Sequence, residues 1–183
     1  DGDFWLVKTD ANGNTCGYSA SGNCEGTSGG TSTFAKTFGR SSEEEVFHLL
    51  QLPDGFLLAG YTRSFGSGGY KGWVVKTDQS GNTCDYAVNG NCEETINGVP
   101  TFAKVFNGPL FEAFRAADQT NDGGFVFVGY TSSFTASSVP WLVKTDSMGN
   151  KCDYLNAAVS GNCEGTSNGM ATFSKTYADT GKP

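Results

Sequence analysis

The residues with the clearest chemical meaning are six cysteines, which fall at matching places in three segments of the chain. Thiols brought close together form disulfides or bind metal ions. Their spacing is longer than that of the short zinc knuckles, and no histidine accompanies them. We therefore expect local disulfides, each closing a short loop worth roughly 2 to 3 kcal/mol of stability. The expected pairs are Cys16 with Cys24, Cys84 with Cys92 and Cys152 with Cys163.

Few other residues have the types and spacing that catalysis needs. Acid–base or nucleophilic chemistry requires a base near a nucleophile, or a pair of carboxylates. The single histidine, His48, lies in an apolar stretch, and the acidic run 43–45 is explained by a solvated approach to a strand. A glutamate follows the second cysteine of each pair, and its repetition indicates bonds to local backbone donors, because an active site is usually unique. These glutamates are Glu25, Glu93 and Glu164.

Two ligand-binding patterns have simpler structural explanations. Asp10, Asn12 and Asn14 alternate like calcium ligands, but later copies of this turn lose the middle ligand, which favours a plain hairpin turn. A tryptophan that recurs in three segments could stack on a sugar, yet its apolar neighbours and its regular spacing favour core packing. These tryptophans are Trp5, Trp73 and Trp141. The sequence predicts no catalytic residue, no metal site and no cofactor.

The tryptophans begin a motif that recurs every 68 residues and positions the cysteines. Trp-Leu-Val-Lys-Thr-Asp at 5–10 returns at 141–146, with a variant at 73–78, and each copy is followed by Gly-Asn and a cysteine. The surrounding runs are short, rich in aromatic and β-branched residues and separated by turn residues, which is typical of strands. The expected strands are 4–9, 33–38, 46–52, 56–62, 73–77, 101–106, 114–120, 125–131, 141–145 and 172–177, with the polar stretch to Ser32 as a surface loop.

Four antiparallel strands per repeat, many of them apolar on both faces, are typical of propeller blades or similar stacked sheets. The fold class predicted is all-β, with four-stranded propeller-like blades in tandem, each carrying a disulfide-closed loop insertion. The chain would hold about two and a half blades: a half blade at 1–40, a blade at 41–108 and a blade at 109–183. Since a propeller needs about four blades to close, this chain alone cannot form a ring.

The predicted half blade lacks the two strands that precede the tryptophan strand in the later repeats. Its first strand should therefore have an unpaired edge, which is a template for another chain. The residues of this possible assembly edge are Phe4, Leu6 and Lys8. A contact between unlike surfaces that does not close into a ring propagates into a filament.

The motifs Trp-Leu-Val-Lys-Thr-Asp-x-x-Gly-Asn at 141–150 and Asp-Gly-Gly-Phe-Val-Phe-Val-Gly-Tyr-Thr at 122–131 carry a family resemblance. The chain resembles the β-propeller-type repeats of bacterial and archaeal secreted and surface proteins, over nearly its whole length except the disulfide loops. The resemblance implies a propeller-like fold and an extracellular setting. It implies little about activity, since fold does not determine function.

Composition narrows the partners and the compartment. Twelve basic and nineteen acidic residues give a net charge of −7, which argues against nucleic acid as a partner. No apolar run is long enough to span a membrane, and the expected disulfides indicate an extracellular or cell-surface location.

We expect a non-catalytic extracellular structural protein whose partners are copies of itself or further repeats of a longer chain. The alternatives are a carbohydrate- or protein-binding propeller module on a cell surface and, third, a propeller enzyme acting on glycosides.

Overall fold

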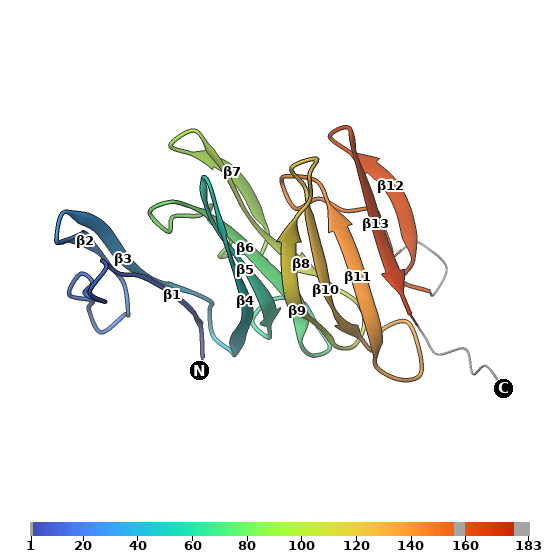
Figure 1. Ribbon diagram of the computed structural model, residues 1–183. Helices are drawn as coiled ribbons and strands as arrows, with labels where there is room; N and C mark the ends of the chain where they lie inside the picture. The colour runs from blue at the N-terminus through green and yellow to red at the C-terminus, as the bar shows by residue number, and fades with distance from the viewer. Residues whose placement is uncertain (1, 156–159, 178–183) are drawn as a thin grey trace.

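The computed structural model describes residues 2–155 and 160–177, and in these residues every regular element is a β-strand. The strands pair antiparallel. Figure 1 shows them as three sheets placed one beside the next, with the first and third sheets at opposite ends of the molecule. The strands are β1 (Phe4–Lys8), β2 (Cys24–Ser28), β3 (Thr31–Phe38), β4 (Glu44–Leu52), β5 (Gly55–Thr62), β6 (Lys71–Asp78), β7 (Cys92–Ile96), β8 (Val99–Phe106), β9 (Glu112–Gln119), β10 (Phe125–Thr131), β11 (Val139–Thr145), β12 (Cys163–Ser167) and β13 (Met170–Thr176).

The sheets have three, five and five strands, so the prediction of four-stranded blades is wrong in strand count. The orders are β1-β3-β2, β4-β5-β6-β8-β7 and β9-β10-β11-β13-β12. Each later sheet contains the expected four-strand meander plus one further strand at its outer edge. The three sheets do not close into a ring (Figure 1).

The additional strands are β2, which lies in the polar stretch to Ser32 that the sequence predicted as surface loop, and its repeat equivalents β7 and β12. Each begins at the second cysteine of a pair and forms a two-residue hairpin with the next strand, as in Ile96 opposite Val99. The hairpin residues Asn97 and Gly98 have φ of 52° and 79°, the positive values that the favoured two-residue turn requires. Asn-Gly was the sequence signal for this hairpin, but the polar composition of its first strand hid the strand.

Two apolar cores hold the sheets together. One lies between the first and second sheets, where the Phe4 and Trp73 ring centroids are 4.9 Å apart. The other lies between the second and third sheets, where Phe106 and Phe114 meet edge to face at 4.9 Å. The second sheet is therefore covered on both faces, which explains why its strands are apolar on both sides.

Close backbone contacts fix the register of β5 with β4 and of β10 with β9. Gly60 and Gly129 lie beside β-bulges, and a Cβ at either would lie 1.9 Å from a carbonyl oxygen of the neighbouring strand. Only glycine fits there, and bulges of this kind bend a strand and strengthen its twist.

Candidate functional site: the two end faces

The six cysteines form three disulfides within their repeats, as the spacing predicted, and none is free. Their Cα atoms lie 5.9, 5.8 and 6.0 Å apart, the ordinary separation for this bond. Each disulfide ties the chain leaving the tryptophan strand to the added edge strand. The bonds indicate an oxidising environment for the protein. The described residues contain no helix with the length and apolarity needed to cross a membrane.

Each tryptophan also anchors its disulfide loop through the indole N–H. Trp5 Nε1 donates to the carbonyl of Gly22 at 3.2 Å, and Trp73 Nε1 donates to that of Gly90 at 3.0 Å. Trp141 Nε1 reaches the third loop through Ser174 Oγ at 2.7 Å, and that hydroxyl donates to the carbonyl of Gly161. The recurrence of tryptophan is thus explained by a structural role.

Core packing is confirmed for Trp73 and Trp141, which are both 0% exposed, but it is wrong for Trp5, which is 49% exposed. Trp73 packs against the first sheet and Trp141 against the second. The face of β1 that carries Trp5 has no described sheet over it. Its aromatic neighbour is Tyr18, edge to face at 5.6 Å and itself exposed.

The aspartate of each turn uses its carboxylate to hold the turn and the added hairpin together. Asp10 accepts bonds from the backbone N–H groups of Asn12 and Asn14, both at 2.9 Å, and from Ser28 Oγ at 2.8 Å. These bonds, the one from Asn14 foremost, lower the pKa of the Asp10 carboxyl. Equivalent bonds surround Asp78 and Asp146. The turn is tight, with the Gly13 N–H donating to the Asp10 carbonyl at 3.1 Å, and the carboxylate is engaged by protein donors. It does not close the expected hairpin, because in the described residues β1 pairs with β3 and not with the chain that follows the turn.

The repeated glutamates bond to lysines rather than to backbone donors, which corrects the expectation for them. Within each sheet a glutamate of the added strand pairs with a lysine of the next strand: Glu25 with Lys36, Glu93 with Lys104 and Glu164 with Lys175. The first two lysines also reach the following sheet. Lys36 Nζ donates to Asn82 Oδ1 at 3.0 Å, and Lys104 Nζ donates to Asn150 Oδ1 at 2.9 Å.

A second contact repeats at the same two junctions. The turn glycine Gly81 lies against the ring of Phe34, where an added Cβ would come within 2.7 Å of the ring. Gly149 lies against Phe102 in the same way, also at 2.7 Å. Both glycines have positive φ, so a side chain there would be strained as well as crowded. These inter-sheet contacts were not predicted from the sequence, although the lysine, asparagine, glycine and phenylalanine all recur in it.

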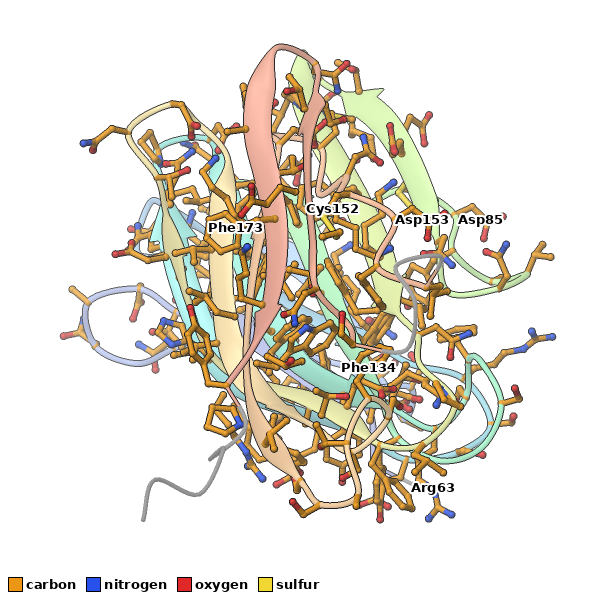
Figure 2. The ribbon with its side chains drawn as sticks, turned by 90° about the vertical axis from the view of Figure 1, so that its right-hand side faces the viewer. Arg63, Asp85, Phe134, Cys152, Asp153 and Phe173 are labelled. Carbon is orange, nitrogen blue, oxygen red and sulfur yellow. A yellow bond between two sulfur atoms is a disulfide. The ribbon has the colours of Figure 1, made fainter. Side chains whose placement is uncertain are left out.

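The outward face of the third sheet exposes positions whose equivalents in the second sheet are buried. Val128 is 43% exposed and Tyr177 is 55% exposed, whereas their repeat equivalents Ala59 and Phe106 are both 0% exposed. Val128, Val126 and Leu142 line a shallow apolar depression of 140 Å³. Figure 2 views the molecule from the side of this sheet, with Phe173 labelled.

The outward face of the first sheet is its counterpart at the other end, and it carries Trp5, Tyr18 and the turn 10–14. The predicted assembly edge belongs to β1 of this sheet, but its apolar side chains do not lie on the outward face. Phe4 and Leu6 are buried in the first core, and Lys8 is half-buried. Only the backbone edge of β1 is open: in the described residues β1 pairs with β3 and with no strand on its other side.

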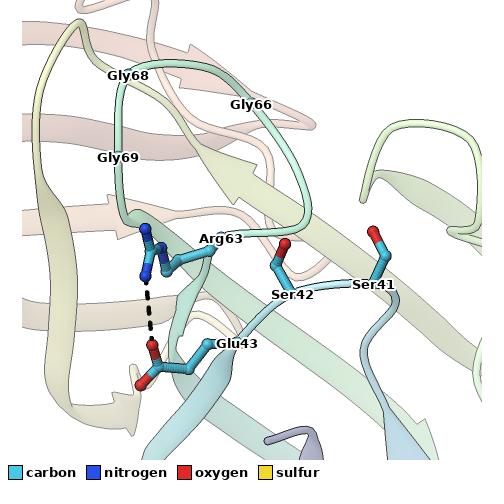
Figure 3. Close-up of a pocket in the computed structure, with 7 residues that line it drawn as sticks. All are labelled: Ser41, Ser42, Glu43, Arg63, Gly66, Gly68 and Gly69. Carbon is cyan, nitrogen blue, oxygen red and sulfur yellow. Dashed lines mark ion pairs between the residues drawn. The ribbon is translucent and has the colours of Figure 1, made fainter. Parts of the chain in front are cut away.

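A hollow of 430 Å³ lies between the chain entering β4 and the glycine-rich loop 63–70 (Figure 3). Its charged side chains are Glu43 and Arg63, which face one another at 3.7 Å. Ser41 and Ser42 lie beside them, and the Ser42 backbone N–H donates to Ser64 Oγ at 3.0 Å.

The acidic run 43–45 was expected to be solvated, but two of its side chains make bonds within the fold. Glu44 is buried and accepts bonds from Thr62 Oγ1 at 2.6 Å and from the backbone N–H of Ser64 at 3.1 Å. Glu43 accepts a bond from Tyr61 Oη at 2.8 Å, and burial together with that bond raises the pKa of the tyrosine. His48 lies half-buried within β4. Glu43 and Glu44 therefore bond to residues of β5 and of the loop that follows it.

The chain matches no protein-family model, and no curated protein matches it.

Proposed function

We propose that this protein is a non-catalytic extracellular structural protein that assembles with copies of itself. One observation carries the proposal: the third sheet leaves exposed, at Val128 and Tyr177, the positions that the second sheet buries completely against its neighbour. Burying apolar area yields about 25 cal/mol per Å², so a sheet built for coverage on both faces favours a further layer.

The repeated polar groups support a structural role. The turn aspartates, the glutamate–lysine pairs and the indole N–H bonds recur from sheet to sheet and each joins two parts of the fold. The three stacked sheets, each with an added strand, also support a structural role. Assembly would then extend the sheet stacking within one chain to neighbouring copies, on a cell surface or in a secreted filament.

Sedimentation velocity of the native chain over a concentration series tests self-assembly. We expect species larger than the monomer whose share rises with concentration. A single monomeric species at every concentration would refute the proposal.

A carbohydrate- or protein-binding module is the second candidate, favoured by the half-exposed Trp5 beside Tyr18. Two aromatic rings at 5.6 Å on an open surface offer a platform for a sugar ring. Glycan-array binding that is saturable and lost in Trp5→Ala, but kept in a variant of the loop 63–70, would support this function over assembly.

A further inference from the structure

The two internal junctions between sheets share two contacts, which run in the same direction at both. At each, a lysine of one sheet bonds the turn asparagine of the next, and a phenylalanine of the first packs on the turn glycine of the next. The pairs are Lys36 with Asn82 and Phe34 with Gly81 at the first junction, and Lys104 with Asn150 and Phe102 with Gly149 at the second. These two contacts are thus used twice within the chain.

The end faces carry the unmatched halves of these contacts. On the third sheet Lys175 bonds Glu164 but, in the described residues, no asparagine of another sheet. Its side chain is 38% exposed, against 20% for Lys36 and 16% for Lys104. Phe173 beside it is half-buried, although its equivalents are fully buried.

The first sheet carries the complementary asparagine and glycine, on three strands that include no counterpart of β9 or β10. Asn14 Nδ2 donates to Asp10 Oδ2 at 3.3 Å, as Asn150 Nδ2 does to Asp146, and no lysine reaches the Asn14 side-chain oxygen within residues 2–155 and 160–177. Gly13 has nothing within 4 Å of the place a Cβ would take, unlike Gly81 and Gly149. Its φ of 81° matches theirs, so the turn is already in the geometry that receives a phenylalanine ring.

We propose, on the basis of the proposed self-assembly, that copies join head to tail. The third sheet of one copy then stacks on the first sheet of the next. Lys175 of one copy donates to Oδ1 of Asn14 in the next, and Phe173 covers Gly13. Trp5 then packs beside Tyr177 of the preceding copy, as Trp141 packs beside Phe106 within the chain at 6.4 Å. The partner is a second copy, because the junction repeats contacts that the chain already makes twice.

This geometry makes the contact heterologous. The donor face supplies the lysine and the phenylalanine, while the acceptor face supplies the asparagine and the glycine, so neither face complements itself. A heterologous contact leaves one donor and one acceptor face free at the ends, and growth continues unless a ring closes.

Two variants with one blocked face each test the direction of assembly. Leu142→Arg places a charge on the donor face, and Trp5→Arg places one on the acceptor face. By sedimentation velocity we expect each variant alone to be monomeric and a one-to-one mixture to form a dimer of the two variants and nothing larger. Arg63→Glu, on the rim of the hollow away from both faces, is the control and should assemble like the native chain.

The outcomes separate this inference from the proposed function. If the native chain assembles but either blocked variant alone still dimerises, each face pairs with itself and the head-to-tail contact is refuted while self-assembly stands. If the native chain is monomeric throughout, the proposed function itself fails. Val128→Arg and Val7→Arg repeat the donor and acceptor tests should a first variant fail to match the native far-ultraviolet circular dichroism.

Discussion

Lys71 and Glu112 form a fully buried ion pair between the second and third sheets, with Nζ and Oε2 3.4 Å apart and both side chains 0% exposed. Lys71 Nζ also donates to the carbonyls of Gly108 at 2.6 Å and Leu110 at 2.5 Å. The lysine is thus satisfied by charge and by hydrogen bonds, as a buried charge must be. It joins the start of the central strand β6 to the segment leading into β9.

Removal of this lysine should destabilise the fold strongly. Lys71→Met leaves Glu112 buried without its counter-charge, and breaking a buried pair in this way costs about 3 to 5 kcal/mol. We expect the urea midpoint to fall accordingly. The double variant Lys71→Met with Glu112→Gln should recover part of the loss, because no uncompensated charge remains. A single variant as stable as the native chain would show that the pair is unimportant.

The first junction has Asp3 where the second has Lys71, and Glu44 where the second has Glu112. Burial and the nearby Glu44 charge raise the pKa of the Asp3 carboxyl. We expect Asp3→Lys to stabilise the protein at neutral pH by roughly 0.5 kcal/mol, since it replaces a like-charge contact with a partly exposed opposite-charge one. Thermal unfolding of Asp3→Lys and of the neutral control Asp3→Asn measures this. A lower stability of Asp3→Lys than of Asp3→Asn would contradict the prediction.

Two tryptophans at the same repeat position should respond differently to truncation. Trp73→Ala removes a fully buried side chain and should cost about 3 to 5 kcal/mol. Trp5→Ala removes a half-exposed ring and one hydrogen bond and should cost about 1 kcal/mol in the monomer. Denaturation in dilute solution compares the two free energies of unfolding. Equal losses would mean that Trp5 is covered in the monomer.

Acid should weaken the turns. The pKa of Asp10 is lowered by bonds from the Asn14 backbone and Ser28. The pKa of Asp146 is also lowered, since bonds led by that from Ser167 outweigh the opposing effect of burial. A carboxyl with a lowered folded-state pKa stabilises the fold above its unfolded value of about 4, and this stability is lost as the pH falls through the folded value.

We therefore expect a lower urea midpoint at pH 3 than at pH 7. The drop should be smaller in Asp10→Asn, which has already lost one of these carboxylates. An unchanged midpoint in the native chain, or an equal drop in the variant, would show that the turn aspartates do not contribute.

Much of the fold could be predicted from the sequence because the repeat marks equivalent positions. The disulfides and the four-strand meanders follow from the spacing of Cys84 and Cys92 and from apolar runs such as 56–62. The added strands were not predicted, because Cys92–Ile96 is polar and lies at a sheet edge, where no core imposes an apolar pattern. Asn97-Gly98 was the usable signal there.

The candidate site was predicted only in outline. The first strand was expected to be where the chain meets a partner. In the part of the chain that the structure describes its outer backbone edge is unpaired, but Phe4 and Leu6 face the first core. Which face a side chain takes depends on register with a neighbouring sheet, which one strand does not reveal. The bond from Lys36 to Asn82 spans 46 residues, and only the stacked sheets bring it together.

Electron cryo-microscopy of the native assembled protein tests the central claim most directly. The head-to-tail account predicts filaments in which sheets continue at an even spacing of about 10 Å across the boundary between copies, with Lys175 of one copy beside Asn14 of the next. Closed dimers that join two third sheets face to face, or particles consisting of isolated single chains, would contradict it.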